Sequence, residues 1–334
     1  MQKIADTMNK KAIEMLDNGT VSSVLAWTKG DLSYDPTPAY FGSPATINHM
    51  VYNFFCGSNL SKYLVEKGES GSSQSEGKVL VFLKPCDTYS FNQLLSEHRV
   101  DRENTHIVGI GCTGMLDIEK FRDKGIKGIL KVIEKENHLE IQTLYGQKNC
   151  EKRDVLLEKC LSCKGKEHKI YDELMGEELS SETKEIDRFA QVVEIENMDS
   201  DKRFTYWRGE LSKCIRCNAC RNICPACSCT KCIFDNVESG VDAKVNITDF
   251  EENLFHIIRA YHVAGRCSDC GECSRACPQR IPLHLLNRKF IKDINAFYGE
   301  FQAGENEECI SPLLHFEQDD VEPNETMKEG ITHA

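Results

Sequence analysis

The chain has 334 residues, of which 40% are hydrophobic and 28% are charged. This length suits two domains of ordinary size. The low apolar fraction favours several small units, or units held together by a bound cofactor, over one large core. The formal net charge of −12 argues against a nucleic-acid-binding protein. No run of 18 apolar residues occurs, so we expect no membrane-spanning helix. The N-terminal segment lacks the apolar core of a signal peptide. We therefore expect a cytoplasmic protein.

Cysteine is the outlying residue type, with 18 in the chain. Seven lie between positions 214 and 232, and four more lie between 267 and 277. A disulfide framework is not expected without an export signal, because thiols stay reduced in the cytosol. Reduced cysteines in such numbers favour metal binding.

Residues 1–200 have the pattern of a mixed α/β domain. The expected elements are a helix over Ile4–Leu16, a strand over 21–27, a helix over His49–Tyr63, a strand over 78–83 with a helix reaching Leu95, and a strand over 105–110. A strand–helix–strand order predicts a small parallel sheet, whose functional sites collect at the carboxyl ends of the strands. Cys86 and Cys112 each follow such a strand end.

Two cysteine runs share the pattern C-x₂-C-x₂-C-x₃-C-P. The first contains Cys214, Cys217, Cys220 and Cys224, and the second contains Cys267, Cys270, Cys273 and Cys277. Three cysteines at this spacing form a tight loop around three irons of a cubane. Paired zinc sites are the alternative, but zinc requires neither the third cysteine at this spacing nor the C-x₃-C-P ending. The runs therefore predict two 4Fe-4S clusters.

The fourth ligand of each cluster is expected to come from the other run. In two-cluster ferredoxins the last cysteine of each run binds the partner cluster. By that precedent cluster I takes Cys214, Cys217, Cys220 and Cys277, and cluster II takes Cys267, Cys270, Cys273 and Cys224. Such crossing brings the two clusters close enough for rapid electron exchange.

Helical sequence fills much of the segment between the two runs. A helix is predicted over Asp249–Ala264, with one apolar face made by Phe250, Leu254, Ile257, Ile258 and Tyr261. His256 and His262 are expected to be packed or surface side chains rather than ligands. The long helical connection favours a mainly α-helical, ferredoxin-like dicluster domain over residues 203–300.

The charge distribution agrees with clusters in this part of the chain. Residues 203–300 carry 14 Lys and Arg against 11 Asp and Glu, a net charge of +3, which leaves −15 on the rest. Clusters held by four thiolates are anionic, so nearby cations offset their charge and raise their potentials.

A third metal centre is predicted in the first domain. Cys160 and Cys163 form a C-x₂-C pair, and together with Cys86 and Cys112 they supply four thiolates from three loops. Cys56 is the reserve ligand. A structural zinc and unmetallated buried cysteines are the alternatives to a third 4Fe-4S cluster.

Three more cysteines follow the first run, at Cys227, Cys229 and Cys232. They could bind an additional metal, replace an assigned ligand or pack around a cluster. The C-terminal residues 301–334 carry nine acidic residues against one lysine, and we expect an acidic, solvated tail.

These motifs resemble one group of 4Fe-4S dicluster electron-transfer subunits. The resemblance is carried by CIRCNACRNICPACSC, by CSDCGECSRACPQRIPLHLLNRKF and by the upstream KPCDTYSF. The group includes the β subunit of sulfhydrogenase, the corresponding iron–sulfur subunit of anaerobic sulfite reductase, and iron–sulfur subunits associated with formate dehydrogenases, flavin oxidoreductases and heterodisulfide reductases. Cys160, Cys163 and the Cys229–Cys232 continuation look closest to the formate dehydrogenase or heterodisulfide reductase branch.

The resemblance implies electron relay between redox partners in an anaerobic multi-subunit oxidoreductase. The partner would be a flavoprotein, hydrogenase, formate dehydrogenase or heterodisulfide reductase-like subunit, and substrate turnover would belong to it. The alternatives are an autonomous reductase with its own pocket in residues 1–200, and a zinc-stapled scaffold. The chain has no dinucleotide fingerprint or phosphate loop, so a flavin is not indicated although neighbouring subunits carry one. No Ser-His-Asp or paired-carboxylate catalytic arrangement is present.

Overall fold

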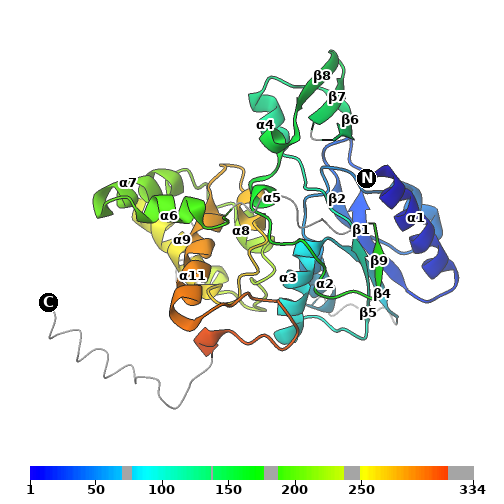
Figure 1. Ribbon diagram of the computed structural model, residues 1–334. Helices are drawn as coiled ribbons and strands as arrows, with labels where there is room; N and C mark the ends of the chain where they lie inside the picture. Colours follow the sequence, from blue (N-terminus) through cyan, green and yellow to red (C-terminus); the bar gives the residue numbers. More distant parts are fainter. Residues whose placement is uncertain (70–76, 137, 177–186, 237–248, 315–334) are drawn as a thin grey trace.

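The computed structural model describes residues 1–69, 77–136, 138–176, 187–236 and 249–314 (Figure 1). A mixed α/β part holds the N-terminal residues, and a group of helices lies beside it. Most of the predicted acidic tail, residues 315–334, lies outside the described residues. No described helix is both long and apolar enough to cross a membrane.

The main sheet has six strands, five of them in the order β2-β1-β4-β5-β9. The short β3 pairs with the end of β1 on the side of β4, because Trp27 and Thr28 pair with β2 on one side and with β3 on the other. Strands β1, β4, β5 and β9 run parallel, whereas β2 and β3 are antiparallel to β1. The strands are β1 (Ser23–Thr28), β2 (Thr37–Phe41), β3 (Met50–Val51), β4 (Val79–Leu83), β5 (Thr105–Ile110) and β9 (Glu173–Met175). The predicted parallel sheet is therefore present, with an antiparallel edge.

The central strands form because their apolar runs are buried. All five residues of β4 are buried, and their register places Phe82 opposite Val108 of β5. Near-continuous hydrophobic sequence is typical of parallel strands that are covered on both faces. The covering helices include α1 (Gln2–Asp17), α2 (Ser61–Glu69) and α3 (Pro85–Ser96).

The predicted helix over His49–Tyr63 is wrong. Strand β3 begins at Met50, a turn follows, and α2 starts only at Ser61. The reason is local, because the Asn53 side chain accepts a hydrogen bond from the Phe55 backbone N–H at 2.8 Å and so stabilises the turn.

A second sheet was not predicted. Strands β6 (Ile129–Lys135), β7 (His138–Thr143) and β8 (Gly146–Glu151) form an antiparallel meander. It packs with α4 (Ile118–Asp123) around the buried side chains of Phe121, Leu139 and Ile141. This unit projects from the main sheet in Figure 1.

Helices make up the described elements between Ala190 and Tyr298. The α-helices are α6 (Ala190–Glu196), α7 (Ser200–Leu211), α8 (Ala219–Asn222), α9 (Asp249–His262), α10 (Glu272–Arg275) and α11 (Leu283–Tyr298), and a short 3-10 helix, η3 (Ile233–Asp235), precedes α9. The short helix α5 (Glu158–Leu161) lies where the α/β part meets this group (Figure 1).

The predicted helix after the first cysteine run is confirmed as α9, but its apolar face does not form the core. Phe250, Ile257 and Tyr261 are 71%, 43% and 64% exposed. The buried side of α9 carries Phe255 together with the polar residues His256 and Arg259. The helix therefore presents polar side chains to the interior, and the cysteine loops lie there.

Candidate metal centres

The two cysteine runs fold into loops with the same backbone conformation. Arg216 and Asn218 of the first run have φ angles of 52° and 60°, and the corresponding Asp269 and Gly271 of the second run have 51° and 66°. These left-handed residues are costly for non-glycine side chains, and such strain persists where the structure needs it. Here they turn backbone N–H groups toward sulfur, as Arg216 N lies 3.3 Å from Cys214 Sγ.

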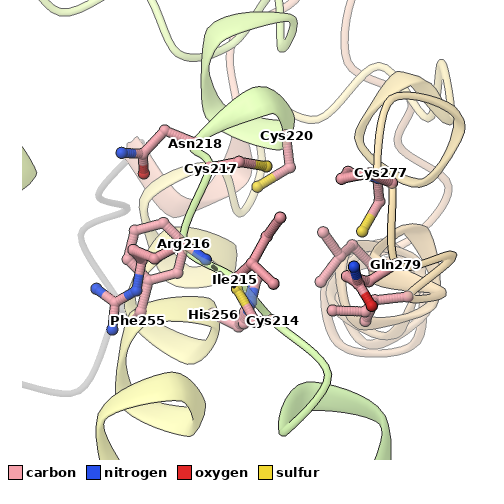
Figure 2. A pocket seen from close by; sticks show the side chains of 13 residues that line it. Cys214, Ile215, Arg216, Cys217, Asn218, Cys220, Phe255, His256, Cys277 and Gln279 are labelled. Atoms are coloured by element: carbon pink, nitrogen blue, oxygen red, sulfur yellow. Dashed lines mark hydrogen bonds between the residues drawn. The ribbon is translucent and has the colours of Figure 1, made fainter. Parts of the chain in front are cut away.

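The first set of thiols surrounds one cavity (Figure 2). The cavity is lined by cysteines from both runs, namely Cys214, Cys217, Cys220 and Cys277. The last cysteine of the second run therefore lies with the first three of the first run, which is the arrangement that crossed ligation requires. Cys217 is exposed, so this set reaches the surface.

The second set contains Cys224, Cys267, Cys270 and Cys273. The charge of Cys224 acts on each of the other three thiols, which requires close approach. Burial, together with nearby Asp269, raises the pKa of Cys267 to about 12, and burial raises that of Cys273 to about 11. Thiols of this kind lose their protons on binding a metal.

The third set lies at the carboxyl ends of β4 and β5. Its members are Cys86, Cys112, Cys160 and Cys163. The side chains of Cys86 and Cys163 share a hydrogen bond, and Cys112 lies within range of the charges of Cys86 and Cys160. Burial, followed by those charges, raises the pKa of Cys112 to about 12. All four cysteines predicted for a third centre are therefore together.

Backbone groups support this third set. Met115 N donates to Cys160 Sγ at 3.4 Å, and Gly165 N donates to Cys163 Sγ at 3.3 Å. A Cβ on Gly165 would lie 2.6 Å from the backbone nitrogen of Cys86, so only glycine lets the two loops approach this closely. The donor chemistry, four thiols with N–H groups directed at sulfur, fits a 4Fe-4S cluster in each of the three sets.

A buried ion-pair network joins the third set to the second. Glu272 is fully buried and accepts hydrogen bonds from Lys159 and, at 2.8 Å, from Arg275. Lys159 also donates to the carbonyl of Gly57 at 2.7 Å. Burial alone would raise the pKa of Glu272, but Arg275 and Lys159 outweigh it and lower the value to about 2. Lys159 precedes Cys160 and Glu272 precedes Cys273, so each end of the network adjoins a ligand candidate.

A second contact lies beside this network. Lys164 follows Cys163 and donates to the backbone carbonyl of Ser268, and the Ser268 hydroxyl lies 2.7 Å from that of Ser90. Burial lowers the pKa of Lys164, although Asp269 acts against it. The α/β part and the helices therefore meet through buried polar groups next to the cysteine loops.

The remaining predicted cysteines lie apart from these three sets or beside one of them. Cys56 is fully buried and is bound within its own turn, because Asn53 N donates to its Sγ at 3.3 Å. Cys227 shares a side-chain hydrogen bond with Cys224. Cys227, Cys229 and Cys232 line a separate cavity of about 310 Å³, together with Arg221, Arg259 and Arg266.

Several buried cations at these centres were not predicted from the sequence. Lys84 is 1% exposed, pairs with Asp87 at 2.9 Å and acts on the thiols of Cys86 and Cys112. Arg259 is 3% exposed and lies among thiols of both runs. The sequence feature that could have indicated Arg259 is its spacing. It follows His256 by three positions, so both polar side chains lie on the same face of α9.

Known proteins match the cysteine-rich part and most of the chain. The 4Fe-4S dicluster domain family matches residues 210–281. The F420-dependent formate dehydrogenase subunit beta of Methanocaldococcus jannaschii is 21% identical, with 91% of this chain and 92% of that protein covered. The F420-dependent formate dehydrogenase 1 subunit beta of Methanococcus maripaludis is 24% identical, with 68% and 73% covered.

Among solved structures, the F420-reducing NiFe hydrogenase complex from Methanosarcina barkeri contains a distantly similar chain. It is 13% identical, covers 48% of this chain and 62% of that one, and has a TM-score of 0.38. The predicted resemblance to formate dehydrogenase-associated subunits is confirmed by the two sequence relatives. This chain is therefore an iron–sulfur protein with a 4Fe-4S dicluster domain, similar over most of its length to formate dehydrogenase beta subunits.

Proposed function

We propose that this chain is the electron-transfer subunit of a formate dehydrogenase complex that is linked to coenzyme F420. Both sequence relatives carry that activity in their names, and the dicluster domain match supports the relay role. The observation that carries the proposal is the gathering of twelve cysteines into three sets of four, with contacts from each set to the next.

Each set holds one cluster in this proposal. The first set, Cys214, Cys217, Cys220 and Cys277, binds cluster I; the second, Cys224, Cys267, Cys270 and Cys273, binds cluster II; the third, Cys86, Cys112, Cys160 and Cys163, binds the third cluster. When bound, 4Fe-4S clusters supply one-electron storage and transfer. The protein supplies the thiolates, the N–H groups directed at them and the buried cations.

The order of the three sets follows from the contacts between residues. Lys159 and Lys164 beside the third set contact Glu272 and Ser268 beside the second. The charge of the buried Arg259 acts on Cys273 of the second set and Cys220 of the first. Cys217 brings the first set to the surface. This linear order supports a role as a conductor between a partner at each end, with a mixed α/β domain over 1–200 and a helical dicluster domain over 203–300.

A second candidate, a reductase with its own pocket, is favoured by one observation. A cavity of about 510 Å³ lies between the α/β part and the helices, and Cys277 of the first set forms part of its wall. Tyr34, Phe55 and Arg275 also line it. A planar redox molecule bound there would lie next to cluster I.

Turnover by the isolated chain separates the two candidates. The chain is purified anaerobically, alone and as the complex that a tag on it retrieves from its native cells. Relay predicts that formate or reduced F420 bleaches the cluster absorbance only in the complex. Rapid turnover of formate or F420 with a dye by the chain alone would instead establish the reductase.

The ligand assignment of the first set predicts the effect of Cys217→Ser. We expect this variant to lose about four irons and one cluster signal in low-temperature electron paramagnetic resonance, because serine removes a thiolate ligand. Part of the helical domain should unfold with it, because ligation contributes to folding. Cys309→Ser is the matched control, since Cys309 lies outside the three sets and hydrogen-bonds the carbonyl of Gln302 at 3.5 Å. Unchanged iron and an unchanged spectrum in Cys217→Ser would refute the assignment.

A further inference from the structure

A polar stripe runs along the buried side of α9. Glu252, His256 and Arg259 follow one another at helical spacing and are 2%, 2% and 3% exposed. Polar side chains are rarely buried so completely unless they have a partner in the interior. The side of α9 that carries them faces the cysteine loops, as Figure 2 shows for His256 beside Cys214.

His256 lies at the first set. It lines the cavity that the four thiols of that set surround, and a ring nitrogen lies within 4.8 Å of Cys214 Sγ. Neither Nδ1 nor Nε2 has a hydrogen-bond partner among the described residues. An imidazole ring carries at least one N–H donor in either protonation state, so His256 can donate into this cavity.

Arg259 lies between the first and second sets. The thiols of Cys220 in the first set and of Cys273 and Cys224 in the second lie within range of its charge. No carboxylate among the described residues forms an ion pair with it, and its buried Nε and Nη2 have no hydrogen-bond partner there. A buried cation of this kind needs compensating charge, and thiolate-bound clusters are the negative groups within its reach.

We propose that α9 tunes the potentials of the two dicluster centres, with Arg259 acting on both and His256 on cluster I alone. This inference rests on the proposed ligand sets. Reduction adds negative charge to a cluster, so a buried cation or an N–H donor at the sulfurs favours the reduced form and raises the potential. Arg259 and His256 are positioning residues, since they act through the ligands rather than on substrate.

The test is a redox titration of the full chain, purified anaerobically and followed by electron paramagnetic resonance. Iron and sulfide analysis comes first, and the signal missing from Cys217→Ser identifies cluster I. In Arg259→Gln we expect both clusters to be harder to reduce, with at least a tenfold lower ratio of reduced to oxidised form at a fixed potential. That ratio corresponds to about 59 mV for a one-electron couple.

Two further variants and a control sharpen the result. His256→Leu should lower the potential of cluster I only. Arg259→Lys keeps the charge but loses the planar guanidinium and its additional N–H donors, so it should shift the potentials in the same direction by less. Arg102→Gln is the control, because Arg102 precedes β5 at the edge of the sheet opposite the cysteine sets and pairs with Asp172 at 2.6 Å. It should leave both potentials unchanged.

The following measured potentials would contradict the inference. Wild-type potentials at both clusters in Arg259→Gln, or a shift at only one of them, would refute the bridging role of Arg259. If Arg259→Gln loses iron, Arg259→Lys decides, and unchanged potentials in that variant refute the role. Equal shifts at both clusters in His256→Leu would refute the selective role of His256. A wild-type chain without iron would instead refute the proposed function, so the two failures are distinguishable.

Discussion

Replacing Glu272 with alanine is expected to destabilise the folded chain by about 3–5 kcal/mol. Glu272 is fully buried and compensates two cations, Lys159 and Arg275, which the variant leaves without their carboxylate. It also accepts a hydrogen bond from Asn59 N at 3.3 Å, so a contact between the α/β part and the helices is lost. An uncompensated buried charge costs far more than a missing surface pair.

Anaerobic thermal unfolding of the cluster-loaded chain measures this effect. A loss of that size lowers the midpoint by roughly 4–7 °C at a fixed scan rate when the chain unfolds as one unit. Glu119→Ala is the matched control, because Glu119 also carries two arginine partners, Arg122 and Arg280, but all three side chains are at least 38% exposed. Its expected cost is about 0–1 kcal/mol. Equal midpoints for the two variants would contradict a structural role for the buried network.

Replacing Cys160 with serine is expected to remove about four irons from a total of about twelve. Cys160 lies beside Cys86, Cys112 and Cys163, and its Sγ accepts a hydrogen bond from Met115 N. The α/β core should remain folded, because the main sheet buries its own apolar side chains independently of these thiols. The two signals of the dicluster domain should also remain.

The iron content is measured by iron and acid-labile sulfide analysis, and the remaining cluster signals are measured by electron paramagnetic resonance. Cys150→Ser is the matched control, since Cys150 lies on β8 in the second sheet, away from the three sets. It should retain all the iron. A Cys160→Ser variant with full iron content and three unchanged signals would exclude the third centre, and zinc in place of iron would support a structural zinc site instead.

Removal of the metal tests how far the helical domain depends on its clusters. Anaerobic treatment with an iron chelator should lower the far-ultraviolet helix signal, because the described core around Leu211 and Phe234 includes the cysteines themselves. The main sheet should persist. A helix signal unchanged after complete loss of iron would show that the domain folds on apolar packing alone.

The sequence by itself determined the cysteine chemistry and the central strands. Cysteine spacing is local, since a C-x₂-C-x₂-C loop folds around its metal whatever surrounds it, and the repeat at Cys214 and Cys267 was therefore readable. The strand over 79–83 was readable for a similar reason, because five consecutive buried apolar residues leave few alternatives to a central strand. Cys86 and Cys112 were expected together, since parallel strands end at the same edge of the sheet.

Only the tertiary structure decided which side of α9 faces inward. Periodicity marks Phe250, Ile257 and Tyr261 as one apolar face, but it carries no information on what lies opposite each face. The cysteine loops occupy the interior, so charge and hydrogen bonding outweigh hydrophobic burial there, and Arg259 and His256 are buried instead. The pairing of Glu272 with Lys159 joins residues 113 positions apart, and only the packing of two separate parts of the chain brings them together.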